Sequence, residues 1–179
     1  MNSKFRVVDL TYMAVGAALT AVCSWISIPS TVPFTLQTFA VFCVLSLLGG
    51  KRGTVSIVIY ILLGAVGMPV FAGFTGGIGI LLGTTGGYII GFILMGLLFW
   101  LAEHFFGNAL PVRIVSMLAG LLVCYAFGTG WFLWVYARQS GAVGIGTALS
   151  WCVLPFILPD LAKMALAVGI AGRVKKFIH

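Results

Sequence analysis

Asp160 and Lys163 are the two residues in this sequence best suited to bind a polar solute. They lie three positions apart within the last apolar run of the chain. Ten residues separate Lys163 from Arg173, which is about 15 Å of helix, or half of the ~30 Å hydrocarbon core of a bilayer. If Arg173 marks one membrane surface, Lys163 lies near the middle. A charge at that depth costs at least about 2.5 kcal/mol, so this pair requires a partner, a wet cavity or a ligand.

Two interpretations of the pair are open. Its i, i+3 spacing places both side chains on one helix face, where they can neutralise each other for structural reasons alone. Pro155 and Pro159 favour a functional role because they remove backbone donors, and irregular backbone at membrane depth normally lines a cavity. We expect a helix to restart at Pro159 and to direct free N–H groups toward that cavity.

The composition is that of an integral membrane protein. Of the 179 residues, 61% are hydrophobic and 7% are charged, too few charges for a soluble domain of this length. The apolar runs are continuous rather than alternating, which indicates helices and excludes an outer-membrane barrel. The basic residues that give the net charge of +7 lie between apolar runs or at the chain ends, so they indicate topology rather than nucleic-acid binding.

We predict an all-α fold, a single transmembrane domain over residues 1–179 with six spans. The predicted spans are 10–28, 36–50, 53–66, 86–106, 112–136 and 150–172. One side of the membrane then holds both termini and the basic residues Lys4, Arg6, Lys51, Arg52, Arg113, Arg173, Lys175 and Lys176, against Arg138 alone on the other. The positive-inside rule places both termini in the cytoplasm of a plasma membrane protein, with Asp160 reachable from outside.

The outer connections are unusually apolar. The first, around residues 29–35, is stiffened by Pro29 and Pro33 and leads into Thr35, Gln37 and Thr38; it is either a lid over a cavity or an ordinary proline-ended turn. The second, 67–85, is too apolar for a solvated loop and too rich in glycine for a span, so we expect a re-entrant or interface-hugging segment.

Small and aromatic residues around the fourth span suggest further contacts. Glycines recur at every fourth position from Gly79 to Gly91, which allows another backbone or a ligand to approach closely. Thr84 or Thr85 is a candidate helix cap. Tyr88 is either a hydrogen-bonded buried residue or an interfacial belt tyrosine. Trp131 lies deeper than the belt residues and is a candidate to pack on a ligand ring.

The first span carries two overlapping Ala-x-x-x-Ala pairs. Their members are Ala14, Ala17, Ala18 and Ala21. Such a smooth face serves either internal helix packing or docking onto a partner membrane protein. The four cysteines lie in apolar runs without metal-ligand spacing and are predicted to be small buried hydrophobes. The sequence contains no nucleophile–base pair, metal cluster or phosphate-binding loop, so we expect neither an enzyme nor a chain that hydrolyses ATP itself.

Four motifs, in order along the whole chain, resemble the BioY family of biotin-binding S components of energy-coupling factor (ECF) transporters. They are PFTLQT at 33–38, GMPVFA at 67–72, GTTGGY at 83–88 and PFILPDLAK at 155–163. Thr84 is a departure, since the family is expected more often to carry proline there. The resemblance implies six helices, a biotin pocket near the outer face under the first loop, and assembly with a transmembrane coupling protein and two cytoplasmic ATPases.

The resemblance also implies roles for particular residues. Asp160 suits the ureido N–H donors of biotin, and Lys163 either reaches the valerate carboxylate or balances Asp160. Gln37, Tyr88 and Thr85 are the next polar candidates, and Phe34, Phe71 and Trp131 are candidates to pack on the ring. The alanine face of the first span is then the docking surface. No cofactor is expected in this chain, since ATP is used by the partner subunits.

Three alternatives stay open at this stage. An S component for another small vitamin would share the architecture and differ in its pocket residues. A stand-alone carrier or channel would predict a polar stripe through several helices, and the sequence shows one acid–base pair instead. A structural membrane subunit would use Asp160 and Lys163 only to neutralise each other.

Overall fold

A computed structural model describes residues 6–29 and 32–178 of the chain. The predicted topology residue Lys4 and residues 30–31 of the first outer connection lie outside these residues, as do the side chains of Lys175 and Lys176. The described part is almost entirely helical. In chain order its elements are α1 (Val7–Trp25), β1 (Ser27–Ile28), β2 (Phe34–Thr35), α2 (Gln37–Ala65), η1 (Ala72–Phe74), α3 (Ile78–Leu82), α4 (Gly86–Phe106), α5 (Leu110–Gln139), α6 (Ile145–Cys152) and α7 (Leu154–Ile178).

Within the described residues, five helical segments are long and apolar enough to cross a membrane, because α2 contains two of the predicted spans. Gly49, with φ 78° and ψ 174°, breaks α2 in its middle, and glycine tolerates this left-handed φ. A Cβ built on Gly53 would lie 3.1 Å from the Leu45 Cα, so the chain after Gly49 runs back along the chain before it. The bundle therefore contains the six predicted spans.

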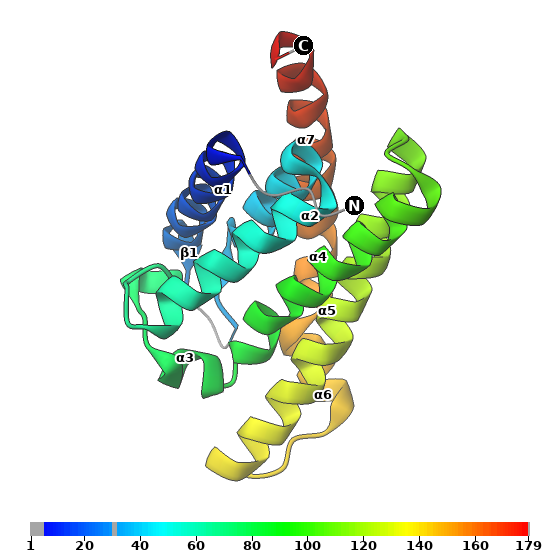
Figure 1. Cartoon of the computed structure of the whole chain (residues 1–179). Helices are drawn as coiled ribbons and strands as arrows, with labels where there is room; N and C mark the ends of the chain where they lie inside the picture. Colours follow the sequence, from blue (N-terminus) through cyan, green and yellow to red (C-terminus); the bar gives the residue numbers. More distant parts are fainter. Residues whose placement is uncertain (1–5, 30–31, 179) are drawn as a thin grey trace.

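The two ends of the bundle differ in structure. Figure 1 shows α1 beginning and α7 ending at one end, where the reversal in α2 also lies. The opposite end holds the β1–β2 hairpin, α3 and α6. Arg52 and Arg113 belong to the first end and Arg138 closes α5 at the other. These basic residues lie at the ends of the bundle that the sequence assigned to them, so the cytoplasmic location of the α1 and α7 ends stays the expectation of the positive-inside rule.

The last predicted span is two helices rather than one. The chain breaks at Val153, with φ −124° and ψ −57°, between α6 and α7. The predicted restart at Pro159 is wrong, because Pro159 lies inside α7 and the helix starts at Leu154. Pro155 explains the position of the break, since proline is tolerated in the first turn of a helix, where no backbone donor is needed.

The segment between α2 and α4 does not cross the membrane. It contains the one-turn helix η1, an isolated bridge between Phe71 and Thr75, and the five-residue helix α3. Phe74 and Ile78 are each 63% exposed. Short helices with exposed apolar side chains fit the predicted interface-hugging segment, since such side chains prefer lipid headgroups to water.

The glycine repeat has a packing role at two of its positions. A Cβ on Gly87 would overlap the Trp131 side chain, and one on Gly91 would lie 2.8 Å from the Cys124 Sγ, so α4 and α5 touch closely here. A Cβ on Gly79 would meet no atom of the described residues within 4 Å. The interpretation as a close-approach surface is therefore confirmed for Gly87 and Gly91 and is wrong for Gly79.

The alanine residues of α1 do not form one docking surface. Ala17 and Ala21 are buried in the core, at 3% and 7% exposure, whereas Ala14 and Ala18 are exposed. The two pairs are offset by about 60° around the helix, and the edge of the bundle falls between them. Docking is therefore excluded for Ala17 and Ala21 and stays a prediction for the outer pair. The four cysteines are buried and free, as predicted.

Replacing Gly87 by leucine is expected to destabilise the bundle by ~1–3 kcal/mol, because the new side chain overpacks the α4–α5 contact at Trp131. Thermal unfolding in detergent measures the effect. Gly169→Leu on α7 is the matched control, since a Cβ at Gly169 would meet nothing within 4 Å in the described residues. Equal unfolding temperatures for the two variants would contradict the close packing.

Candidate functional site

Asp160 and Lys163 are buried inside the bundle on the same face of α7. Their exposed fractions are 2% and 6%, and the Lys163 Nζ lies 2.8 Å from the Asp160 Oδ1. The predicted pairing is confirmed. A buried pair of opposite charges is stable only when its remaining donors and acceptors are also bonded, so the neighbours of the pair decide what it does.

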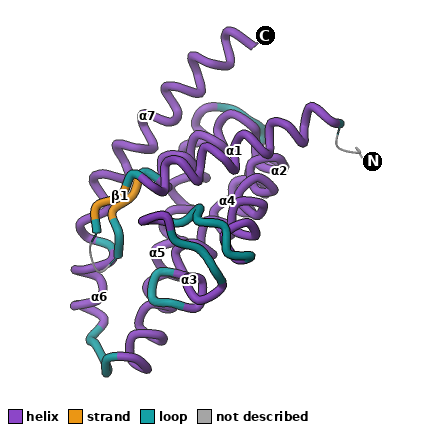
Figure 2. Tube along the Cα trace, turned by 90° about the vertical axis from the view of Figure 1, so that its left-hand side faces the viewer, coloured by secondary structure: helices purple, strands orange, loops and turns teal. Residues whose placement is uncertain are grey.

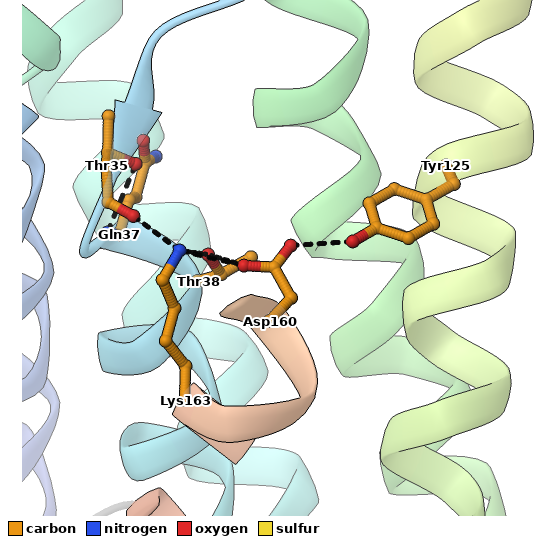
Figure 3. Close-up of polar contacts among 6 residues, drawn as sticks. All are labelled: Thr35, Gln37, Thr38, Tyr125, Asp160 and Lys163. Atoms are coloured by element: carbon orange, nitrogen blue, oxygen red, sulfur yellow. Dashed lines mark hydrogen bonds and ion pairs between the residues drawn. The ribbon is translucent and has the colours of Figure 1, made fainter. Parts of the chain in front are cut away.

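The ammonium group of Lys163 donates all of its hydrogen bonds to groups of the protein itself. Its Nζ donates to the Thr35 carbonyl oxygen at 2.7 Å and to the Thr38 Oγ1 at 3.2 Å, in addition to Asp160. Figure 3 shows these contacts converging at the junction of β2 and α2. An ammonium group has three hydrogens, so Lys163 has none left for a ligand in this arrangement.

Asp160 is held by three side chains from three helices. Its Oδ1 accepts from Lys163 and from the Thr38 hydroxyl at 2.9 Å, and its Oδ2 accepts from the Tyr125 hydroxyl at 2.7 Å (Figure 3). The sequence reasoning missed Tyr125, on α5. A tyrosine in the middle of an apolar span needs a hydrogen-bond partner, and that need was the available signal.

The ion pair lies in the wall of a cavity of about 220 Å³. The cavity is at the outward end of the bundle, between α7, the start of α2, the segment before α4, and the inner faces of α4 and α5. Of the predicted ligand-binding residues, six line it: Gln37, Phe71, Thr85, Tyr88, Asp160 and Lys163. Lining residues not predicted include Thr75, Phe92, Leu121, Tyr125 and Phe156. The wall is mostly apolar with a few polar groups, as in small-molecule sites generally.

Gln37 carries an unused hydrogen-bond donor at the cavity. The residue is 5% exposed, and its Nε2 has no hydrogen-bond partner among the described residues. A buried donor left unpaired costs about 1–3 kcal/mol. This amide is therefore available to an acceptor on a ligand. The backbone N–H of Gln37 donates to the Thr35 Oγ1 at 3.2 Å, and this bond fixes the start of α2.

Tyr88 and Thr85 contribute in different ways. The Tyr88 hydroxyl is 2.9 Å from the Thr129 Oγ1, so the prediction of a hydrogen-bonded buried tyrosine is confirmed. Thr85 occupies the N-cap position of α4 but makes no side-chain cap bond. The predicted capping role is therefore wrong for Thr85, whose side chain lines the cavity instead.

Two predicted aromatic residues do not line the cavity. Trp131 donates its Nε1–H to the Gly83 carbonyl at 3.0 Å and faces a shallow groove on the outside of α5; its predicted ligand contact is wrong because this bond turns the ring away. Phe34 instead supports the site from outside. It stacks on Phe156 at 5.7 Å between ring centres, and the Lys163 Nζ lies 4.3 Å from its ring centre.

The β1–β2 hairpin covers this wall of the cavity. Figure 2 shows the hairpin (orange) lying against the chain where α6 meets α7. Its strands pair Ser27 with Thr35 and Ile28 with Phe34, and Val32 and Pro33 line the cavity. The described end of the proline-containing connection therefore borders the site, in keeping with the interpretation as a lid, and residues 30–31 lie outside the described residues.

The whole chain matches a known family. The BioY family profile covers residues 1–179. This chain is a member of the BioY family. A biotin transporter BioY of Thermotoga maritima is 44% identical over 173 residues, which are 94% of this chain and 96% of the relative. The biotin transporter BioY2 of Lactococcus lactis is 36% identical over 169 residues, 93% of this chain and 89% of that one.

A solved structure shares the fold of this BioY chain. The crystal structure of the S-component for biotin from an ECF-type ABC transporter matches with a TM-score of 0.81 and 30% sequence identity. The match covers 98% of this chain and 95% of the other. The six-span, S-component-like bundle predicted from the sequence is thereby confirmed.

Replacing Tyr125 by phenylalanine is expected to lower the free energy of unfolding by ~1.5–3 kcal/mol, because Asp160 loses a buried hydrogen bond to a charged oxygen. Unfolding in detergent, followed by heat or denaturant, measures the loss. Tyr136→Phe is the control. It also deletes a tyrosine hydroxyl, but Tyr136 makes ring contacts and no hydrogen bond among the described residues, so the free energy of unfolding is expected to change little. An equal effect of both changes would show that the bond to Asp160 is unimportant.

Proposed function

We propose that this chain binds biotin from outside the cell and delivers it as the S component of an ECF-type transporter. The observation that carries the proposal is the buried cluster of Asp160, Lys163, Thr38 and Tyr125 in the wall of an outward cavity. Membership of the BioY family along the whole chain supports it. The role is that of a transport subunit rather than an enzyme.

The ureido group of biotin fits the polar wall of the cavity. Asp160 is the acceptor for a ureido N–H group, because its Oδ2 accepts one hydrogen bond and keeps a second lone pair, whereas its Oδ1 already accepts two. The unpaired Gln37 Nε2 is the donor for the ureido carbonyl. Phe71 and Phe156 supply the apolar surface for the rings. Tyr88 bounds the same space from α4.

Lys163 balances Asp160 and does not reach the valerate carboxylate. Its three hydrogens are already bonded to Thr35, Thr38 and Asp160, so a bond to the ligand would break one of these. The hydroxyl of Thr85, on a different wall from α7 and without a cap bond, is the polar group that we assign to the carboxylate end. This arrangement resolves the difficulty of holding both ends of an extended ligand with two side chains one turn apart.

Uptake requires subunits beyond this chain. The sequence has no phosphate-binding loop of its own, so ATP hydrolysis is assigned to two cytoplasmic ATPases that act through a transmembrane coupling protein. The exposed pair Ala14 and Ala18 on α1 is the proposed docking surface, since small residues allow close helix approach. The proposal places the protein in the plasma membrane of a bacterium.

Asp160→Asn is expected to weaken biotin binding by about ten- to a hundredfold, because a charged acceptor is replaced by an amide that also disturbs Lys163. Isothermal titration calorimetry of the purified protein measures the change. Asp9→Asn is the matched control, since Asp9 is an equally buried acid that pairs with Arg52 at the other end. Near-normal affinity of a folded Asp160→Asn protein would refute the assignment.

A panel of vitamins separates biotin from other ligands of the same architecture. If the wild-type protein binds another vitamin more tightly, the ligand is wrong while the transport role stands. Radiolabelled uptake with and without the coupling proteins then separates an S component from a stand-alone carrier, and uptake that is complete without them would contradict the proposed partners.

Ala18→Trp is expected to reduce assembly with the coupling protein while leaving biotin affinity unchanged, because the side chain is exposed on the proposed docking face. Co-purification of the two proteins measures assembly. Leu122→Trp, on the exposed face of α5 at 67% exposure, is the control. Normal assembly of the Ala18→Trp protein would place docking elsewhere.

A further inference from the structure

Arg113 is a buried cation without a partner at the cytoplasmic end. The residue is 9% exposed, and its Nε and Nη2 are buried with no hydrogen-bond partner among the described residues. Its Nη1 makes no hydrogen bond there either and does not belong to the buried set, so this nitrogen is the accessible edge of the guanidinium. An unpaired buried charge is strongly unfavourable, and it needs an anion.

The acidic side chains of the chain are already engaged. The sequence has three of them. Asp9 forms an ion pair with Arg52 at 2.9 Å, and Asp160 lies at the outward site. Glu103 accepts hydrogen bonds from the Gly50 N–H and from the Asn108 side chain. The anion that Arg113 needs therefore has to come from outside these side chains.

The start of α5 adds further donors at the same place. Pro111 has no N–H, and the first backbone bond into this helix is from the Arg113 N–H to the Ala109 carbonyl. The N–H groups of Leu110 and Val112 therefore make no backbone bond within the described residues. Long side chains on a helix lean toward its N-terminus, so the guanidinium and the positive end of the helix dipole face the same region.

The surface beside Arg113 is apolar, which identifies the source of the anion. Phe105, Phe106 and Leu110, at the turn between α4 and α5, are 68%, 74% and 52% exposed. Such side chains at a membrane end lie among lipid headgroups and upper acyl chains rather than in water. A lipid phosphate is therefore the anion best placed to meet the accessible edge of Arg113.

We propose that Arg113, together with the N-terminus of α5, binds the phosphate of an anionic phospholipid in the cytoplasmic leaflet. The acyl chains lie against Phe105, Phe106 and Leu110. Guanidinium and phosphate form charge-assisted hydrogen bonds, here through the accessible Nη1, and the charge of the phosphate offsets the charge of the buried guanidinium.

Lipid retention by the purified protein tests the site. In native mass spectrometry from detergent, the wild-type protein is expected to retain one phosphatidylglycerol about tenfold more strongly than phosphatidylcholine. Arg113→Gln is expected to abolish this preference, and Arg113→Lys to keep part of it. Arg173→Gln is the matched control, because Arg173 is an exposed cation at the cytoplasmic end of α7 and the charge change is the same.

Unfolding temperatures give a second readout and identify the source of the anion. Phosphatidylglycerol is expected to raise the unfolding temperature of the wild-type and Arg173→Gln proteins but not that of Arg113→Gln. Stabilisation by inorganic phosphate alone, with none from the lipid, would overturn the lipid assignment. Equal lipid preference in the Arg113→Gln and wild-type proteins would overturn the site. The site would also be overturned if phosphatidylglycerol raised the unfolding temperature only of the assembled transporter and not of this protein alone.

The test does not depend on the proposed ligand of the outward cavity. Arg113 is in the first turn of α5, which starts at the end of the bundle where α7 finishes (Figure 1), whereas Asp160 lies in the first half of α7. Biotin affinity measured in the same micelles is therefore expected to be unchanged in Arg113→Gln. If the wild-type protein shows no preference between the two lipids, the site is refuted. This outcome is decisive whether or not the Arg113→Gln protein folds.

Discussion

The ion pair between Asp160 and Lys163 is the interaction on which the outward half of the molecule depends. Both charges are buried in an apolar bundle, where either one alone would be strongly unfavourable. They are tolerated because each neutralises the other and because Thr35, Thr38 and Tyr125 complete their hydrogen bonds. This network ties the start of α2, the middle of α5 and α7 together, so the geometry of the cavity follows from the requirement to satisfy two charges.

A neutral ion pair with one free acceptor position gives the cavity a particular kind of selectivity. The pair presents the remaining lone pair of the Asp160 Oδ2 without a net charge, beside the unpaired amide donor of Gln37. A neutral group with both donors and an acceptor, such as a urea, matches that pattern, whereas a free cation or anion does not. The apolar remainder of the wall, including Phe71 and Phe156, suits the rest of such a ligand.

The two ends of the bundle differ in how regular their backbone is. The outward end is irregular, with a two-stranded hairpin, an isolated bridge and short helices, and backbone of this kind at membrane depth is tolerated where it lines a cavity. The cytoplasmic end consists of tight helix reversals, one of them held by the bond from Gly50 to Glu103. Some charges there pair within the chain, as Asp9 and Arg52 do, and Arg113 is the one for which we propose a lipid phosphate.

The sequence alone predicted the six spans and the pairing of Asp160 with Lys163, because hydropathy and the rarity of intramembrane charge are local properties of the chain. The tertiary structure decided which side chains contact the ion pair and the cavity and which face outward. Tyr125 joins Asp160 from a position 35 residues away, Trp131 turns outward to bond Gly83, and the edge of the bundle divides the alanines of α1. Each outcome depends on how helices rotate and pack against one another, and spacing along a single helix does not fix that rotation.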